Sequence, residues 1–389
     1  MREAVIVSAA RTPVGKVRGS LASVPAHKLG ALVVKEAVRR AKIDPAEIEE
    51  VIFGNLMNHE VNNMARVVAL EAGLPVEVPG VTLDRQCGTS LNSVAYAAMY
   101  IEAGYADVIV AGGVESDSRR PYILDKPTMA YQMMPPQFSE ILLAPPQCGN
   151  MPMGITAENL AVKYKLTRQE CDEFSLASHR KGAAAWESGY FADQIVPVTV
   201  DLGKGKTFTL DFDEPLRKDA NMEALSKLQP AFKSDGIVTA GNSSPQSDGA
   251  GAVVVMERKK AEAMGAEILA VFKGFTAVGV DPSIMGIGPV PATRKLLKRA
   301  GLTIDQIDLI ELNEAFAAQS IPCVRELGID MNKLNVNGGA IALGHPLAGS
   351  GAILTTKLLY EMRRRDVRRG IVTFCCGGGQ GVAALFERI

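Results

Sequence analysis

The 389-residue chain lacks an excess of charge of either sign. Its 42 lysines and arginines face 43 aspartates and glutamates, which gives a formal net charge of -1. No whole-chain field therefore attracts it to nucleic acid or to an anionic membrane, and we expect neither as a partner. A local basic run covers residues 363–365, 368 and 369. We interpret this run as the solvated end of a helix.

Long apolar runs and an apolar leader are also missing. No segment reaches the roughly 18–20 apolar residues that a membrane-spanning helix needs. The first residues, MREAVIVSAARTP, turn almost at once into a strand pattern and leave no space for a signal peptide. We therefore expect a cytoplasmic, globular protein. Its length gives room for two or three domains and a large core.

The six cysteines lack the spacing of a metal site or of a disulfide framework. Neither C-x-x-C nor a matching pair of histidines occurs, so we expect no metal. A long chain without a secretory signal also disfavours disulfides. Cys375 and Cys376 are adjacent, and neighbouring side chains of an extended segment point to opposite faces. Only one of these two thiols is therefore expected to face a given cavity.

Short apolar runs alternate with helical stretches, which indicates an α/β fold. The first part predicts strands over residues 4–8 and 51–54, a helix over 27–41, and strand, turn, helix and strand over 81–116. The last part repeats this plan. It predicts a strand over 269–279, a helix over 291–301 and a strand within 304–316. A strand, a glycine loop and a helix follow over 334–364, and two strands over 369–389 end the chain. Two similar halves predict a duplicated α/β unit.

The stretch between the halves has a different composition. It is rich in methionine, proline and glutamine and contains a helical segment over residues 155–189. Long excursions of this kind are usually functional lids or binding loops. Residues 248–256 then read as a strand that returns to the first half. The predicted domains are 1–117 with 249–264, a loop domain over 118–248, and a second half over 265–389.

Two residues are candidates for a nucleophile and its base. Cys87, in DRQCGTSLNS, lies where a strand changes to a helix, so free N–H groups and the helix dipole are expected to lower its pKa towards neutrality. The alternative is a small buried side chain. His345 lies in NGGAIALGHPLAGSG, where small residues leave the backbone accessible, and is a candidate general base. The alternative is a phosphate-binding loop with an incidental histidine, but the Walker and GxGxxG patterns are absent. His27, His59 and His179 are interpreted as structural or surface residues.

Asn313 follows an apolar run and so lies at the end of a strand, where α/β folds build their sites. It is a candidate for holding a water or polarising a carbonyl, and the alternative is an Asx turn or a helix cap. Thiol, imidazole, amide and second thiol, at corresponding places in two similar halves, together indicate acyl transfer through a thioester.

At this point the sequence resembles the thiolases, the acetyl-CoA acetyltransferase and 3-ketoacyl-CoA thiolase family. The likeness covers essentially the whole chain and rests on DRQCG, GGVES, MGITAEN, VTAGNSS, NEAFAAQ, GGAIALGHPLAGSGA and CCGGGQG in family order. It implies the thiolase fold, two duplicated α/β halves in a layered αβαβα arrangement with an inserted loop domain. It also implies a homodimer or homotetramer. Acyl-CoA and coenzyme A would be substrates, and no cofactor would be bound permanently.

The resemblance implies a role for each candidate residue. Cys87 is expected to accept the acyl group. His345 is expected to deprotonate the Cys87 thiol, and Cys375 to act as the second acid/base. Asn313 would hold a water in one oxyanion hole, and the N–H groups of Cys87 and Gly377 would form another. Arg217 and Ser244 match positions that touch coenzyme A. Met153, Phe316 and, more weakly, Met285 match walls of the acyl pocket.

The chain departs from the family pattern near the site. Pro152 stands where biosynthetic members have histidine, Thr89-Ser90 follows the nucleophile glycine, and Ala348-Gly349 reverses the usual order. These changes bear on acyl size and leave the four chemical groups in place.

Two other classes of protein remain open alternatives. A ketoacyl synthase or hydroxymethylglutaryl synthase is disfavoured by the second cysteine. A silent acyl-CoA or lipid-binding module is disfavoured by the presence of all four groups.

Overall fold

The computed structural model describes residues 2–131 and 135–389. Residues 1 and 132–134, the latter in the predicted loop domain, lie outside the described part. One ten-stranded sheet has the order β10-β11-β12-β9-β1-β8-β5-β3-β4, with β2 paired to β8. No helix of the described chain is long and apolar enough to cross a membrane.

The first half of the sheet is built by five main strands. They are β1 (Ala4–Arg11), β3 (Glu50–Gly54), β4 (Gly80–Leu83), β5 (Val108–Ser116) and β8 (Ser247–Glu257), joined by the short β2 (Gly15–Lys16). Its helices are α1 (Ala26–Ala41), α2 (Met64–Glu71), α3 (Thr89–Ala103) and α7 (Arg258–Ala263). β8 pairs antiparallel with both β1 and β5, so the predicted return to the first half is confirmed.

The second half repeats the first. Its strands are β9 (Ala270–Gly279), β10 (Leu309–Leu312), β11 (Arg369–Cys376) and β12 (Gln380–Glu387), and its helices are α8 (Pro289–Ala300), α9 (Ala317–Leu327), α10 (Ala340–Leu343) and α11 (Ser350–Arg365). β9-β12-β11-β10 runs antiparallel, antiparallel, parallel, as β1-β8-β5-β3 does. The predicted duplication is therefore confirmed in both connectivity and strand direction.

One predicted strand is wrong. We expected a strand at the start of residues 334–364, but Leu334 makes only a single parallel bridge to Ile310. The next residue, Asn335, has φ +40°, which takes the backbone out of the extended region. Its side chain hydrogen-bonds the N–H and C=O of Leu312 at 2.9 Å each, and so replaces the ladder.

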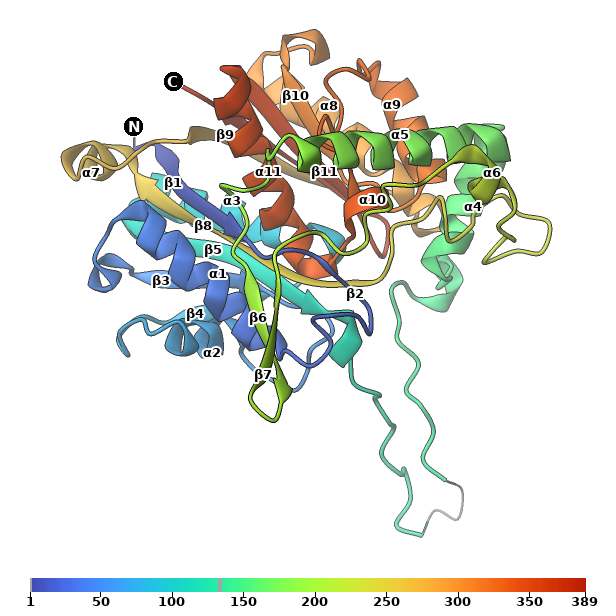
Figure 1. Cartoon of the computed structure of the whole chain (residues 1–389), viewed down its shortest axis with the longest axis horizontal. Helices are drawn as coiled ribbons and strands as arrows, with labels where there is room; N and C mark the ends of the chain where they lie inside the picture. Colours follow the sequence, from blue (N-terminus) through green and yellow to red (C-terminus); the bar gives the residue numbers. More distant parts are fainter. Residues whose placement is uncertain (1, 132–134) are drawn as a thin grey trace.

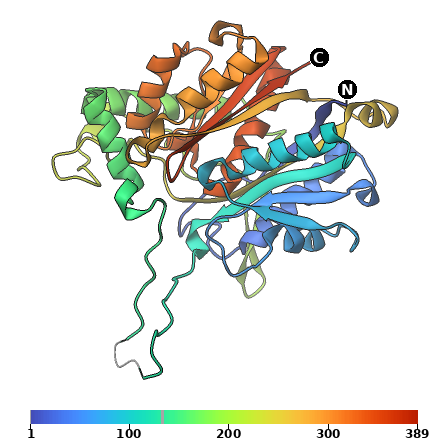
Figure 2. The same ribbon diagram turned by 180° about the vertical axis from the view of Figure 1, so that it is seen from behind.

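Three apolar cores separate the layers. Leu29 of α1 and Met64 of α2 pack on the outer face of the first half-sheet, together with Val5 and Val7 of β1. The alternate residues of β1, Ala4 and Ile6, face a central core that contains α3 and α11. A third core lies under α8 and α9. Figure 2 shows these layers from behind. The order is αβαβα, as predicted.

The middle of the chain forms the predicted excursion. It holds α4 (Met153–Lys163), α5 (Arg168–Glu187), β6 (Val198–Gly203), β7 (Lys206–Leu210) and α6 (Met222–Ser226). The single expected helical segment is two helices, because Lys165 has φ +52° and Thr167 begins α5 with a capping box. An extended arm, described over residues 120–131 and 135–152, precedes α4 and projects from the body in Figure 1.

Candidate active site

Cys87 lies in a tight turn between β4 and α3. Its sulfur accepts hydrogen bonds from the N–H groups of Gly377 and of Cys87 itself, which favour the thiolate. Burial outweighs these donors and raises the pKa of Cys87 to about 11, and the negative charges of Glu115 and Asp117 add to the rise. The expected lowering of this pKa is therefore wrong. The resting group is a thiol, and its use as a nucleophile requires a base.

The residue after the nucleophile glycine, a departure from the family pattern, stabilises this turn. The hydroxyl of Thr89 accepts the N–H of Arg85 at 2.7 Å and donates to the carbonyl of Gln86 at 2.6 Å. Ser90, the next departure, accepts the N–H of Ala352 at 2.9 Å. Ser90 thereby ties the start of α3 to the start of α11.

His345 lies between α10 and α11 and is buried. Its Nε2 lies 3.3 Å from Nδ2 of Asn313, and its Nδ1 lies 2.6 Å from the hydroxyl of Ser350. With the amide nitrogen of Asn313 facing Nε2, the matching tautomer has Nε2 as the acceptor and its proton on Nδ1, which donates to Ser350. Burial lowers the pKa of His345 to about 4, so the ring is neutral near pH 7. This is the protonation state of a general base. Sequence reasoning did not identify Ser350.

Asn313 follows β10 directly. Its N–H donates to the carbonyl of Thr373 at 3.0 Å, which fixes the residue at the strand end. Its Oδ1 is buried without a hydrogen-bond partner among the described residues. A buried acceptor of this kind is normally satisfied, here by a water or a ligand.

The two adjacent cysteines are separated by the sheet. Cys375 packs into an apolar cluster with Met153, Met285 and Phe316, whereas Cys376 packs into the central core. Their predicted orientation to opposite faces is confirmed. Burial raises the pKa of Cys375 well above its ordinary value, and the next cause is the charge of Cys87. Burial and then the charge of Cys87 also raise the pKa of Cys376, so both adjacent thiols lie within electrostatic range of Cys87.

Glu314 holds the backbone that leads to His345. Its carboxylate accepts hydrogen bonds from Ser178 and Asn335 at 2.7 Å and from the N–H of Ile341 at 3.3 Å. It is fully buried among these donors. Of the polar residues in the sequence motif NEAF, only the asparagine was predicted to take part in the chemistry. The contacts of Glu314 reach residues far along the chain and have no local signal.

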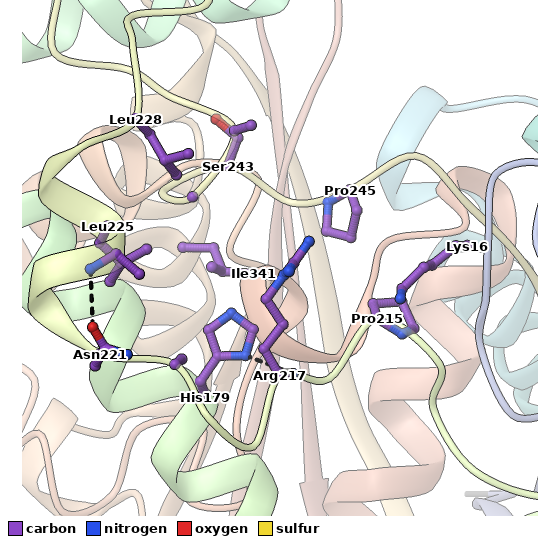
Figure 3. A pocket seen from close by; sticks show the side chains of 14 residues that line it. Lys16, His179, Pro215, Arg217, Asn221, Leu225, Leu228, Ser243, Pro245 and Ile341 are labelled. Carbon is purple, nitrogen blue, oxygen red and sulfur yellow. Dashed lines mark hydrogen bonds between the residues drawn. The ribbon is translucent and has the colours of Figure 1, made fainter.

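A cavity of about 280 Å³ lies beside this site (Figure 3). Its lining includes Lys16, His179, Arg217, Ser243 and Ile341. Arg217, whose contact with coenzyme A stays a prediction, is among these lining residues. Ile341 also packs in the cluster of Cys375, which connects the cavity to the site.

Ser244 and His179 differ in their position relative to this cavity. Ser244 does not line it, and its N–H donates to the carbonyl of Ala315 at 2.9 Å. His179, interpreted as an ordinary helical residue, does line it, and its Nδ1 accepts the N–H of Arg217 at 3.3 Å. Burial lowers the pKa of His179 to about 4. No pattern in the sequence distinguished it from other histidines.

No group of three or more His, Cys, Asp or Glu side chains is placed to hold a metal ion within the described ranges.

Comparisons with known proteins agree along the whole chain. Residues 4–259 match the family model "Thiolase, N-terminal domain" and residues 266–388 match "Thiolase, C-terminal domain". The chain is 49% identical to an acetyl-CoA acetyltransferase of Escherichia coli over 394 residues, and 47% identical to a 3-ketoacyl-CoA thiolase of Bacillus subtilis over 400 residues, with 100% of each chain covered. Its structure superimposes with a TM-score of 0.93 and 40% identity on human mitochondrial 3-ketoacyl-CoA thiolase in complex with CoA, covering 100% of this chain and 98% of that one.

Proposed function

The chain belongs to the thiolase family and is an acyltransferase, and from that premise we propose that acyl groups pass between coenzyme A thioesters through an acyl-Cys87 intermediate. In one direction coenzyme A cleaves a 3-ketoacyl-CoA. In the other, two acetyl-CoA molecules condense to acetoacetyl-CoA. The observation that carries the proposal is the buried, neutral imidazole of His345, held between Asn313 and Ser350.

Acylation uses Cys87 and His345. The sulfur of Cys87 attacks the thioester carbonyl while its proton passes to Nε2 of His345. The carbon–sulfur bond to coenzyme A then breaks, and the leaving thiolate takes the proton of Cys375, which leaves Cys375 as a thiolate and His345 protonated. The N–H groups of Cys87 and Gly377 already point at the sulfur. Donors aimed at a developing oxyanion contribute about 3–4 kcal/mol each in comparable enzymes.

The second step uses Cys375. As the thiolate left by acylation, it removes the α-proton of acetyl-CoA, and the enolate attacks the carbonyl of acetyl-Cys87. The bond from that carbon to the Cys87 sulfur breaks, and the sulfur takes the proton held by His345. In the cleavage direction Cys375 takes the proton of the coenzyme A thiol instead. Burial raises the pKa of Cys375, so its thiolate is a strong base suited to a poorly acidic C–H group. Asn313 would hold a water with its free Oδ1 in the other oxyanion hole.

The cavity beside Arg217 is the proposed channel for the coenzyme A part of the substrate. Its cationic side chains, Lys16 and Arg217, suit phosphate groups. Met153, Met285 and Phe316 would form the apolar wall against the acyl group. We assign the covering role to the loop domain over residues 118–248, which supplies Arg217 and Met153. The two halves are then 1–117 with 249–264, and 265–389.

Coenzyme A thioesters are the substrates of thiolases, and no step above needs a permanently bound cofactor. We propose a homodimer or homotetramer. Support comes from β4, which ends the sheet with a half-exposed Val81, and from the apolar side chains of the arm, Tyr122, Leu124 and Phe138. A cytoplasmic location stays a prediction.

The test is thiolysis of acetoacetyl-CoA and longer 3-ketoacyl-CoAs, with the acyl adduct mapped by mass spectrometry. We expect the label on Cys87. Cys375→Ala should still be acylated by acetyl-CoA but fail in condensation, because the base for the α-proton is gone. Cys148→Ala, which removes an exposed thiol, should behave as wild type. An active enzyme without label on Cys87 would refute the mechanism.

A further inference from the structure

Glu115 is a fully buried carboxylate close to the proposed nucleophile. It lies on β5, one residue before the strand ends, opposite Gly249 of β8. It forms no salt bridge with any described residue. Its titratable neighbours are Asp117 and the Cys87 thiol, and Asp248 follows on the paired strand. A buried charge without a cationic partner is costly, so its position needs an explanation.

Backbone N–H groups from two separate loops bind this carboxylate. Oε1 accepts the N–H of Met57 at 2.9 Å, in the loop after β3. Oε2 accepts the N–H of Ala348 at 3.3 Å. Ala348 lies in the five-residue step between His345 and Ser350, the two residues whose side chains are hydrogen-bonded to each other. Glu115 therefore anchors the turn that carries the imidazole and the hydroxyl that orients it.

The end of β5 is also in close contact with the same turn. A Cβ added at Gly113 would lie 2.3 Å from the carbonyl oxygen of Ala348, so only glycine allows the turn to approach this closely. The close backbone contact at Gly113 and the hydrogen bond to Glu115 together fix this turn in position relative to β5. This contact also restricts the position of His345, since only Pro346 and Leu347 separate it from Ala348.

The charge of Glu115 acts on Cys87 as well. Ionised Glu115 raises the pKa of the Cys87 thiol, and Asp117 does the same to a smaller extent. Burial raises the pKa of Glu115 itself to about 8. At pH 9 the carboxylate is mostly ionised and opposes formation of the thiolate.

We propose that Glu115 is a positioning residue of the acyl-transfer site, which holds the His345–Ser350 turn in place and whose carboxylate, once ionised, opposes formation of the Cys87 thiolate. It touches neither substrate nor reacting atoms. The proposal rests on the proposed function for its first half. Its second half concerns the reactivity of a thiol and is measured without any acyl-CoA.

Two readouts separate the two effects. The rate of Cys87 acylation by acetyl-CoA in a single turnover reports the position of His345. The rate of Cys87 alkylation by iodoacetamide at pH 9 reports the thiolate fraction. Both rates are followed by mass spectrometry of the Cys87 peptide, because Cys148 is an exposed thiol that iodoacetamide can alkylate as well. Circular dichroism verifies that each variant is folded.

Three variants are compared with wild type. E115D keeps the charge but is one methylene shorter, so we expect acylation to fall on the order of 10- to 100-fold with alkylation unchanged. E115Q removes the charge and turns an amide N–H₂ towards one backbone N–H. We expect slower acylation but alkylation about 3- to 10-fold faster. D117N is the matched control, since its amide oxygen still accepts the N–H of Ser247. It should accelerate alkylation, less than E115Q does, and retain acylation.

The proposal is overturned if E115D is acylated as fast as wild type, or if E115Q is alkylated at the wild-type rate while D117N is faster. If E115D does not fold, E115Q decides both halves. Failure of the proposed function looks different, since wild-type Cys87 would then not be acylated at all while the alkylation rates still differ between variants.

Discussion

At the residue scale, burial decides the protonation state of every group at the site. Cys87 lies half-buried in the turn before α3 and receives two N–H donors, yet the loss of solvation raises its pKa to about 11. His345 loses its charge for the same reason. The resting pair is therefore a neutral thiol and a neutral imidazole, not an ion pair. Proton transfer has to accompany the attack on the thioester.

His179 gives a prediction at this scale. Its folded pKa of about 4 lies below the ordinary value of 6.5. As the pH falls through 6.5 the unfolded chain takes up a proton that the folded chain refuses, so the free energy of unfolding decreases. Between pH 7.5 and 5.0 His179 should account for a loss of about 2 kcal/mol.

Urea denaturation at these two pH values measures this loss. His179→Gln, which keeps an acceptor for the N–H of Arg217, should lose less stability on acidification than wild type. His59→Gln, at an exposed loop position, should follow the wild-type slope. Equal slopes for wild type and His179→Gln would contradict the prediction.

The residues that sequence reasoning identified share a local signal. Cys87, Asn313, His345 and Cys375 are polar or reactive groups beside glycine or at the end of an apolar run. Ser350 and Glu314 were missed because their roles come from contacts with distant segments. The contact of His179 with Arg217 was missed for the same reason, since only the folded chain brings the two residues together.

At the element scale, the strands were easier to identify than their limits. The apolar run before CCGGGQG became β11 as expected, and its mate β12 follows directly. The run at residue 334 failed because a single asparagine side chain took the place of a strand partner. Such a replacement is invisible to a pattern of apolar residues.

Glycine 381 of β12 gives the prediction at this scale. A Cβ at Gly381 would lie 2.0 Å from the carbonyl oxygen of Gly288, just before α8. Gly381→Ala should therefore force the helix away from the sheet and destabilise the protein by about 1–3 kcal/mol. Because Gly381 pairs with Cys375, condensation activity should fall too.

Gly279, at the end of the neighbouring strand β9, is the matched control. The nearest atom to its added Cβ is 4.0 Å away, so Gly279→Ala should leave stability almost unchanged. Midpoints of urea denaturation compare the two variants. A Gly381→Ala protein as stable as Gly279→Ala would show that α8 shifts without cost.

At the scale of the whole molecule, the projecting arm is the part least explained by one chain. Tyr122 is 83% exposed and Phe138 70% exposed, and their rings lie 5.4 Å apart. Apolar side chains this exposed usually mark a contact surface.

If the arm joins copies of the chain, Tyr122→Asp with Phe138→Asp should lower the molar mass measured by light scattering. Acylation of Cys87 should persist in the smaller species, because the site residues lie elsewhere. Leu202→Asp, at an apolar residue 63% exposed on β6, is the control and should leave the mass unchanged. An unchanged mass for the double variant would exclude the arm from the interface.

The sequence by itself determined the duplicated α/β plan, the resemblance to thiolases and the identity of the reactive groups, because these depend on local patterns and on motifs in order. Only the tertiary structure decided their chemical states and their neighbours. Burial depends on the whole packing, so it reversed the expected pKa of Cys87. Contacts such as those of Glu115 with Met57 and Ala348 join segments far apart in the chain, and no local pattern records them.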